Sequence, residues 1–219
     1  MRHWIIANGS SLNQTPLDLL KGEITWGMNR IHLIYGTTSW RPTYFFMCDW
    51  NQQNPHNYWK ECIKAHWTTK KYLWDGFRDG HPYFDLEPMG EVPSTTWIQR
   101  CKRHHYYMAN NWKRAESWHL PELCTAFSGI GAVMQLAVLN GATELYIVGA
   151  DLYEPDYRLN FFTENYTDDQ RPRDELDNTN MTQVHMVAKR SSPVPIYNAT
   201  VGGKLEVHPR VKIEDVLNG

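Results

Sequence analysis

Short apolar runs, each followed closely by a polar residue, recur along the chain. The runs and the polar residues after them are 4–7 with Asn8, 24–28 with Asn29, 43–48 with Asp49, and 144–148 with Asp151. Runs of this length and composition are typical of strands that are buried on both faces of a parallel sheet. Because the carboxyl ends of parallel strands meet at one edge, we expect the four polar side chains to converge there.

A helix followed by a strand is predicted between Leu123 and Asp156. Ile130, Val133, Met134, Ala137 and Val138 recur at helical spacing, so residues 129–139 are expected to form an amphipathic helix. Asn140-Gly141 provides its end, because glycine adopts the left-handed conformation at little steric cost. Residues 144–148 then form a strand, which Gly149-Ala150-Asp151 leave at its carboxyl end.

The remaining pattern adds two strands and several helices. Strands are expected at 71–74 and 195–197, and helices after Thr15-Pro16, at 56–67, within 96–118, at 182–190 and at 213–217. The order of elements predicts an α/β fold with a mostly parallel sheet flanked by helices. We expect one domain over residues 1–219, with an inserted helical or irregular lobe at about 75–121 and an acid-rich lid loop at about 154–180.

Two small polar loops are candidates for binding an anion. Asn8-Gly9-Ser10 follows the first strand, and Ser128-Gly129 stands where the central helix begins. Backbone N–H groups at a helix start favour a phosphate. Neither loop is a dinucleotide fingerprint or a P-loop, because G-x-G-x-x-G and Gly-Lys-Ser/Thr are absent. The alternative is that the glycines serve packing and the polar residues at the strand ends only form turns.

Composition narrows the choice of partner. The net charge of −2 argues against a protein that coats nucleic acid, although basic and aromatic residues mix between Arg100 and Arg114. Aromatic residues make up 13% of the chain, which suits either stacked ligands or a large core. The four cysteines and the His104-His105 pair lack metal-ligand spacing, so no metal site is predicted.

The start of the chain and its longest apolar runs indicate location. Met1-Arg2-His3 leads directly into a strand-like segment, so no secretory signal is expected. No apolar run reaches the length of a membrane span, so no integral membrane segment is expected. A cytoplasmic protein is the resulting expectation.

Several stretches together resemble known families. WIIANGSSL, MNR at 28–30 and SGIGAVMQLAVLNGATELYIVGADLY resemble motifs of the Campylobacter-type bacterial sialyltransferases. The closing IYNATVGGKLEVHPRV resembles a neighbouring family that contains the motility accessory factors and the archaeal MptE-type 6-hydroxymethylpterin diphosphokinases. The resemblance covers roughly the first 50 and last 100 residues. It implies a Rossmann-like domain that binds a nucleotide at the carboxyl ends of its sheet.

The resemblance also implies roles for individual residues. Those matching the family's nucleotide-binding positions are Asn8, Asn29, Ser128, Gly129 and the strand end Gly149–Asp151, beside the loop residues Gly9 and Ser10. Asp49 departs from the family, which has an asparagine there, and a carboxylate would repel a diphosphate unless a cation or ribose hydroxyls meet it. The family's catalytic histidine has no clear match. Asp49, His185 and the acids of 154–177 are the candidates for the base.

Three functions remain open at this stage. The first is a glycosyltransferase that uses a nucleotide-activated sugar, with a nonulosonic acid as a possible donor and a glycan or glycoconjugate as a possible acceptor. The second is a diphosphokinase of the pterin type, in which Asp49 and Asp151 would hold Mg²⁺ for ATP. The third is a nucleotide- or carbohydrate-binding domain without catalysis. No cofactor is assigned, and Mg²⁺ enters only under the diphosphokinase hypothesis.

Overall fold

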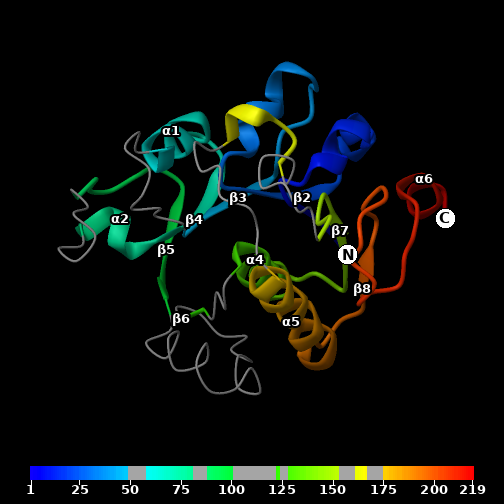
Figure 1. The fold of residues 1–219 in the computed structure, drawn as a ribbon. Helices are drawn as coiled ribbons and strands as arrows, with labels where there is room; N and C mark the ends of the chain where they lie inside the picture. Colours follow the sequence, from blue (N-terminus) through cyan, green and yellow to red (C-terminus); the bar gives the residue numbers. More distant parts are fainter. Residues whose placement is uncertain (49–57, 81–87, 101–121, 124–127, 153–160, 167–174) are drawn as a thin grey trace.

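A parallel sheet of eight strands forms the centre of the protein in this computed structural model (Figure 1). The structure describes residues 1–48, 58–80, 88–100, 122–123, 128–152, 161–166 and 175–219. The strands are β1 (Arg2–Ile6), β2 (Ile24–Met28), β3 (Tyr44–Met47), β4 (Lys70–Trp74), β5 (Thr95–Arg100), β6 (Glu122–Leu123), β7 (Glu144–Val148) and β8 (Ile196–Asn198). Each pair of neighbours is parallel, which confirms the predicted Rossmann-like α/β fold.

The strand order places a switch point between β1 and β7. The order is β6-β5-β4-β3-β2-β1-β7-β8. Strands β2 to β6 therefore follow one another on one side of β1, and β7 and β8 lie on its other side. In open α/β sheets, the loops on the two sides of such a point diverge and leave a crevice at the carboxyl ends of the strands. The topology therefore puts the ends of β1 and β7 at the position where a ligand is expected.

Helices cover both faces of the sheet. α4 (Gly129–Leu139) and α5 (Glu175–Ser191) lie on one face, and α1 (Tyr58–Ala65) lies on the other with the 3₁₀ turns η1 (Ser10–Gln14), η2 (Leu17–Leu20) and η3 (Ile31–Gly36) (Figure 1). The other short helices are α2 (Asp75–Asp79), η7 (Glu164–Tyr166) and α6 (Ile213–Asn218). Among the described helices, none is both long and apolar enough to cross a bilayer.

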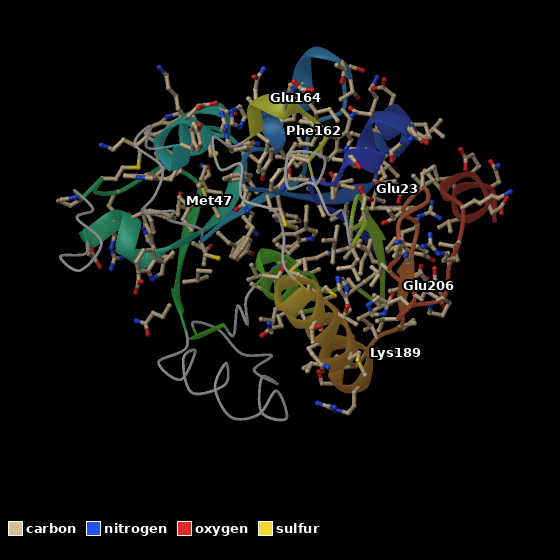
Figure 2. All side chains as sticks on the ribbon, viewed as in Figure 1. Glu23, Met47, Phe162, Glu164, Lys189 and Glu206 are labelled. Carbon is tan, nitrogen blue, oxygen red and sulfur yellow. The ribbon has the colours of Figure 1, made fainter. Side chains whose placement is uncertain are left out.

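Side chains fill the space between the sheet and the helices (Figure 2), and many of the buried ones are aromatic. The ring of Trp4 on β1 stacks on Tyr146 of β7 at 4.7 Å between centroids, and Tyr146 stacks on Tyr197 of β8 at 5.2 Å. On the other side, Trp26 of β2 stacks on Tyr44 of β3 at 4.4 Å. These residues are register partners on neighbouring strands. Many of the aromatic residues noted in the sequence therefore stabilise strand pairing.

The predicted strands agree closely with the observed ones, and the helices agree less well. β2 and β7 have the predicted bounds, and β1, β3, β4 and β8 are shifted by one or two residues. The helix expected after Thr15-Pro16 is wrong in type, because this segment forms the short 3₁₀ turn η2. For α4, the predicted bounds of 129–139 are confirmed, but the prediction that the helix is amphipathic is wrong. Residues 130–137 are all buried, because α4 packs against both the sheet and α5.

Two predicted segments have different limits in the structure. Residues 95–100, placed in the inserted lobe and in a possible helix, form strand β5, which pairs in parallel with β4. The lid loop expected to reach residue 180 ends earlier, because α5 begins at Glu175. Residues 101–121, which hold the rest of the lobe and most of its basic residues, lie outside the described residues.

Candidate functional site

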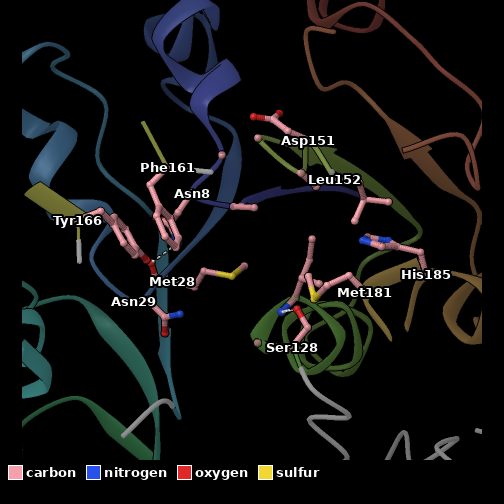
Figure 3. Close-up of a pocket in the computed structure, with 16 residues that line it drawn as sticks. Asn8, Met28, Asn29, Ser128, Asp151, Leu152, Phe161, Tyr166, Met181 and His185 are labelled. Carbon is pink, nitrogen blue, oxygen red and sulfur yellow. Dashed lines mark hydrogen bonds between the residues drawn. The ribbon is translucent and has the colours of Figure 1, made fainter. Parts of the chain in front are cut away.

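A cavity of about 140 Å³ opens at the switch point (Figure 3). It lies at the carboxyl ends of β1, β2 and β7, beside the start of α4 and one side of α5. Eight of the ten residues singled out in the sequence line it: Asn8, Gly9, Asn29, Ser128, Gly129, Gly149, Asp151 and His185. Ser10 lies beside it through a hydrogen bond to Asp151. Asp49, the tenth, lies outside the described residues.

The loop after β1 is tied to the end of β7. Asp151 Oδ2 accepts hydrogen bonds from the Ser11 N–H at 2.8 Å and from the Ser10 hydroxyl at 3.1 Å. The Gly9 N–H donates to the Gly149 carbonyl at 2.8 Å. The donors that the sequence offered to a phosphate in this loop are therefore engaged within the protein. The loop shapes the wall of the cavity, and the carboxylate of Asp151 adds a negative charge to it.

Two glycines permit this close approach. A Cβ atom on Gly9 would lie 2.5 Å from both Asp151 Oδ2 and the Gly149 carbonyl oxygen. Gly149 has φ +72°, and a Cβ there would lie 2.8 Å from the Leu12 side chain. Any larger residue would separate the two strand ends, so both glycines are explained by packing as well as by any contact with a ligand.

Three residues that line the cavity each carry an acceptor oxygen with no partner in the described part of the chain. Asn8 Oδ1, Asn29 Oδ1 and Asp151 Oδ1 are buried and accept no hydrogen bond within the described part of the chain. The Asn8 amide is oriented by its nitrogen, which donates to the Met28 carbonyl at 3.2 Å. Buried polar atoms are normally paired, so orphan atoms at one cavity indicate that a ligand or water completes them.

Two residues in the cavity lining have a strained backbone conformation. Asn29 has φ +50° and Leu152 has φ +48°, and both line the cavity. The Asn29 N–H donates to the Phe46 carbonyl at 3.1 Å, which fixes the turn at the end of β2. Left-handed non-glycine residues cost free energy and cluster at functional sites.

The start of α4 supplies donors to the cavity. Ser128 is the N-cap, and its hydroxyl oxygen accepts a hydrogen bond from the Ile130 N–H at 3.3 Å. The first N–H groups of a helix have no intrahelical acceptors, and the helix dipole adds partial positive charge at this end. This part of the lining has a favourable field for an anion. Among the described residues that line the cavity, none is a lysine or arginine.

His185 closes the opposite end of the cavity from Asn29 (Figure 3). Its side chain is fully buried, and its Nδ1 lies 3.2 Å from His208 Nε2. Burial lowers the pKa of His185 to about 3, with a smaller effect from His208. Burial also lowers the pKa of His208 to about 4, assisted by Lys189. Both imidazoles are therefore neutral near pH 7.

The segment 161–166 forms an aromatic wall that the sequence analysis did not identify. Phe161 and Tyr166 line the cavity and stack with their centroids 3.9 Å apart. Arg30 holds this segment against the end of β2, because its guanidinium donates to the Asn165 carbonyl at 2.8 Å and to the Tyr166 carbonyl. Arg30 directly follows Asn29, and that position was the only signal in the sequence.

The closing motif that resembled the second family orders the chain behind the cavity. Asn198 Nδ2 donates to the Leu205 carbonyl at 2.7 Å, and Arg210 donates to the Gly202 carbonyl at 2.6 Å. The Lys204 N–H donates to the Asp151 carbonyl at 2.6 Å. These bonds fix the loop that carries His208. No sequence pattern indicated that His208 contacts His185, because the two are 23 residues apart and belong to different elements.

A metal centre is not evident in the part of the chain that the structure describes. No group of three or more His, Cys, Asp or Glu residues there is close enough to hold an ion. Asp151 contributes one carboxylate, and one of its two oxygens already accepts two hydrogen bonds.

Comparison with protein-family models, curated proteins and solved structures finds no match. The resemblance to nucleotide-dependent transferases therefore depends on the quoted sequence motifs alone. The geometry of the cavity supports ligand binding independently of these motifs.

Proposed function

We propose that the chain binds a nucleotide or nucleotide-activated sugar in the cavity at the β1/β7 switch point and acts as a glycosyltransferase. The observation that carries the binding proposal is the set of three buried, unpaired acceptor oxygens of Asn8, Asn29 and Asp151 beside a capped helix start. Ribose hydroxyl groups are donors that would satisfy such oxygens, and a phosphate is the natural ligand of the helix start.

The helix start at one end of the cavity and the asparagine side chains at the other suggest an orientation for the ligand. The phosphate would sit at the start of α4, near Ser128 and Gly129. The sugar hydroxyls would meet Asn8 and Asn29 at the other end. The volume is below the roughly 300–1,000 Å³ of pockets that enclose whole drug-sized ligands. A nucleotide-activated sugar would therefore extend beyond the cavity.

The proposed reaction is displacement at the anomeric carbon of the bound sugar. A hydroxyl of the acceptor would attack that carbon, a general base would take the hydroxyl proton, and the nucleotide would leave with its phosphate. Asp49 and the acids between Glu154 and Asp177 are the candidates for the base. The donor class rests on the resemblance of the quoted motifs, because a cavity of this kind suits several nucleotides.

Asp151 favours one alternative. Its Oδ1 is unpaired at the cavity, and a carboxylate oxygen is a ligand that Mg²⁺ prefers. With Asp49 as a second ligand, the cavity would bind ATP with Mg²⁺, as the diphosphokinase hypothesis requires. The described residues of the lining include no lysine or arginine, which counts against ATP, because its triphosphate normally meets basic side chains.

A thermal-shift panel tests the proposal. CMP, CDP, UDP, GDP, ADP and ATP are each added with and without Mg²⁺, because a ligand that binds the native state raises the melting temperature. A shift with a pyrimidine nucleotide and no need for metal supports the transferase. A shift only with ATP and Mg²⁺ supports the diphosphokinase. No shift with any nucleotide contradicts nucleotide binding.

One variant pair tests the position of the site. Ser128→Trp places an indole in the cavity and should abolish the nucleotide-dependent shift, at a cost of about 1 kcal/mol for the lost cap. Leu19→Trp is the control, because Leu19 is half exposed on η2 and does not line the cavity. Equal shifts in both variants would remove this cavity from the proposal.

A further inference from the structure

The hydrogen bond between His185 and His208 leaves one nitrogen of each ring unpaired. His185 Nδ1 and His208 Nε2 lie 3.2 Å apart, and the two rings are nearly perpendicular at 74°. His185 Nε2 and His208 Nδ1 are both buried and have no partner among the described residues. Only His185 lines the cavity, with its ring reaching toward Leu152 and Met181 (Figure 3). The two unpaired nitrogens are therefore not equivalent.

The position of the proton between the rings follows from this difference. Each neutral imidazole carries one N–H. If His185 donated from Nδ1, the N–H of His208 would be at Nδ1, buried and without an acceptor. If His208 donates from Nε2, the N–H of His185 is at Nε2, at the edge of a cavity where a ligand or water can accept it. A buried N–H without an acceptor is rarer than an unpaired acceptor, so the second arrangement is favoured.

We propose that His208 is a positioning residue that holds His185 as a neutral donor, with its Nε2–H directed at a phosphate oxygen of the bound nucleotide. The inference rests on the proposed function for the identity of the ligand, but the tautomer itself does not depend on that identity. His185 and the start of α4 line the same cavity, and together they offer neutral donors to a phosphate at a lining whose described residues include no lysine or arginine.

This assignment changes the role given to His185 in the sequence analysis. A ring with a pKa of about 3 is a weak general base near neutral pH, so it is poorly suited to take a proton from an acceptor hydroxyl. A fixed N–H donor instead stabilises the negative charge that develops on the leaving phosphate. The base of the proposed transfer is then a different residue.

The tautomer can be measured directly by nitrogen-15 NMR of the histidine rings at pH 7. His185→Gln and His208→Gln each remove one set of ring signals and so assign them. We expect one fixed form of His185, with Nε2 protonated and Nδ1 unprotonated. A proton on Nδ1 of His185, or a mixture of the two forms, would overturn the inference whether or not any nucleotide binds.

Two variants of His208 test its effect on binding. The amide N–H of glutamine in His208→Gln can still donate to His185 Nδ1, whereas leucine in His208→Leu cannot. Calorimetry should show that His208→Leu binds CMP about 10-fold more weakly than the wild type. A loss of this size is close to the lower end of the free energy contributed by a hydrogen bond to a charged group. His208→Gln should recover the wild-type affinity. Binding of cytidine, which lacks the phosphate, should not change.

The outcomes separate this inference from the proposed function. Equal losses for CMP and cytidine would mean that His208 only supports the fold, and the inference would be wrong. If the wild-type protein binds neither compound, the proposed pyrimidine ligand is wrong, and the NMR result alone decides the tautomer.

Discussion

The polar residues of the cavity are held in conformations that cost free energy. Asn29 is left-handed at φ +50°, and its amide oxygen Oδ1 is buried without a partner among the described residues. Asparagine tolerates this backbone better than other residues with a side chain, because its short amide can bond locally. The hydrogen bond from its N–H to the Phe46 carbonyl keeps the turn in place. The residue thus combines two costs that a bound ligand would partly offset.

Substitution of Asn29 separates these two costs. Both Asn29→Gly and Asn29→Ala remove the amide, but only alanine carries a Cβ into the left-handed backbone. We expect Asn29→Ala to be about 1 kcal/mol less stable than Asn29→Gly in urea unfolding, and both to bind the nucleotide equally weakly. Equal stability of the two variants would show that the backbone at this position is not strained.

At the scale of elements, the sequence predicted the sheet better than the helices. β2 and β7 are mostly apolar and are followed closely by polar residues, so their bounds could be predicted. β5 was missed because Thr95–Arg100 mixes polar and apolar residues without alternation. α4 was predicted as amphipathic because the pattern cannot show that α5 covers its outer side.

The residues of the candidate site also differ in how far the sequence could predict them. Asn8, Asn29 and Ser128 were predictable because each stands at the end of a strand or the start of a helix. Phe161 and His208 were not, because their place near the cavity depends on contacts between distant segments. Local patterns indicate where elements end, whereas tertiary packing decides which loops meet there.

Asp151 joins two elements, and its substitution should lower both stability and binding. Asp151→Asn removes the charge that accepts from Ser10 and Ser11, so we expect a loss of about 1 kcal/mol in the free energy of unfolding. Affinity for CMP should fall several-fold, because an asparagine whose oxygen still accepts from the Ser11 N–H places its NH₂ group where Oδ1 would accept from a ribose hydroxyl.

A charge control completes this experiment. Asp79→Asn removes an exposed carboxylate on α2, outside the cavity lining, and should leave the affinity for CMP unchanged. The diphosphokinase alternative predicts for Asp151→Asn the loss of Mg²⁺-dependent ATP binding. Unchanged affinity for both CMP and ATP would contradict both functions assigned to this carboxylate.

At the scale of the whole molecule, buried histidines link stability to pH. His3, His66, His185 and His208 are each at most 2% exposed. Burial lowers the pKa of His185 to about 3 and of the other three to about 4. They come from β1, the turn after α1, α5 and the loop after β8, so the effect is spread across the fold.

Acid should therefore unfold this protein over a narrow range. The unfolded chain takes up a proton at each histidine near pH 6.5, whereas the native state does so only near pH 3–4. Between these values the unfolded state binds more protons, so stability falls as the pH falls, by about 1.4 kcal/mol per pH unit for each histidine. Together, four such histidines would remove much of a typical free energy of unfolding, about 5–15 kcal/mol, as the pH falls by one or two units.

Urea unfolding at a series of pH values between about 7 and 5 measures the slope of the free energy of unfolding, and hence the number of protons taken up. His66→Gln replaces one ring by a group that does not titrate. His66 lies between the Tyr35 hydroxyl and the Cys62 carbonyl, away from the cavity lining. The variant should lose stability at pH 7 and show a slope lower by about one proton. An unchanged slope would mean that His66 titrates normally in the native state.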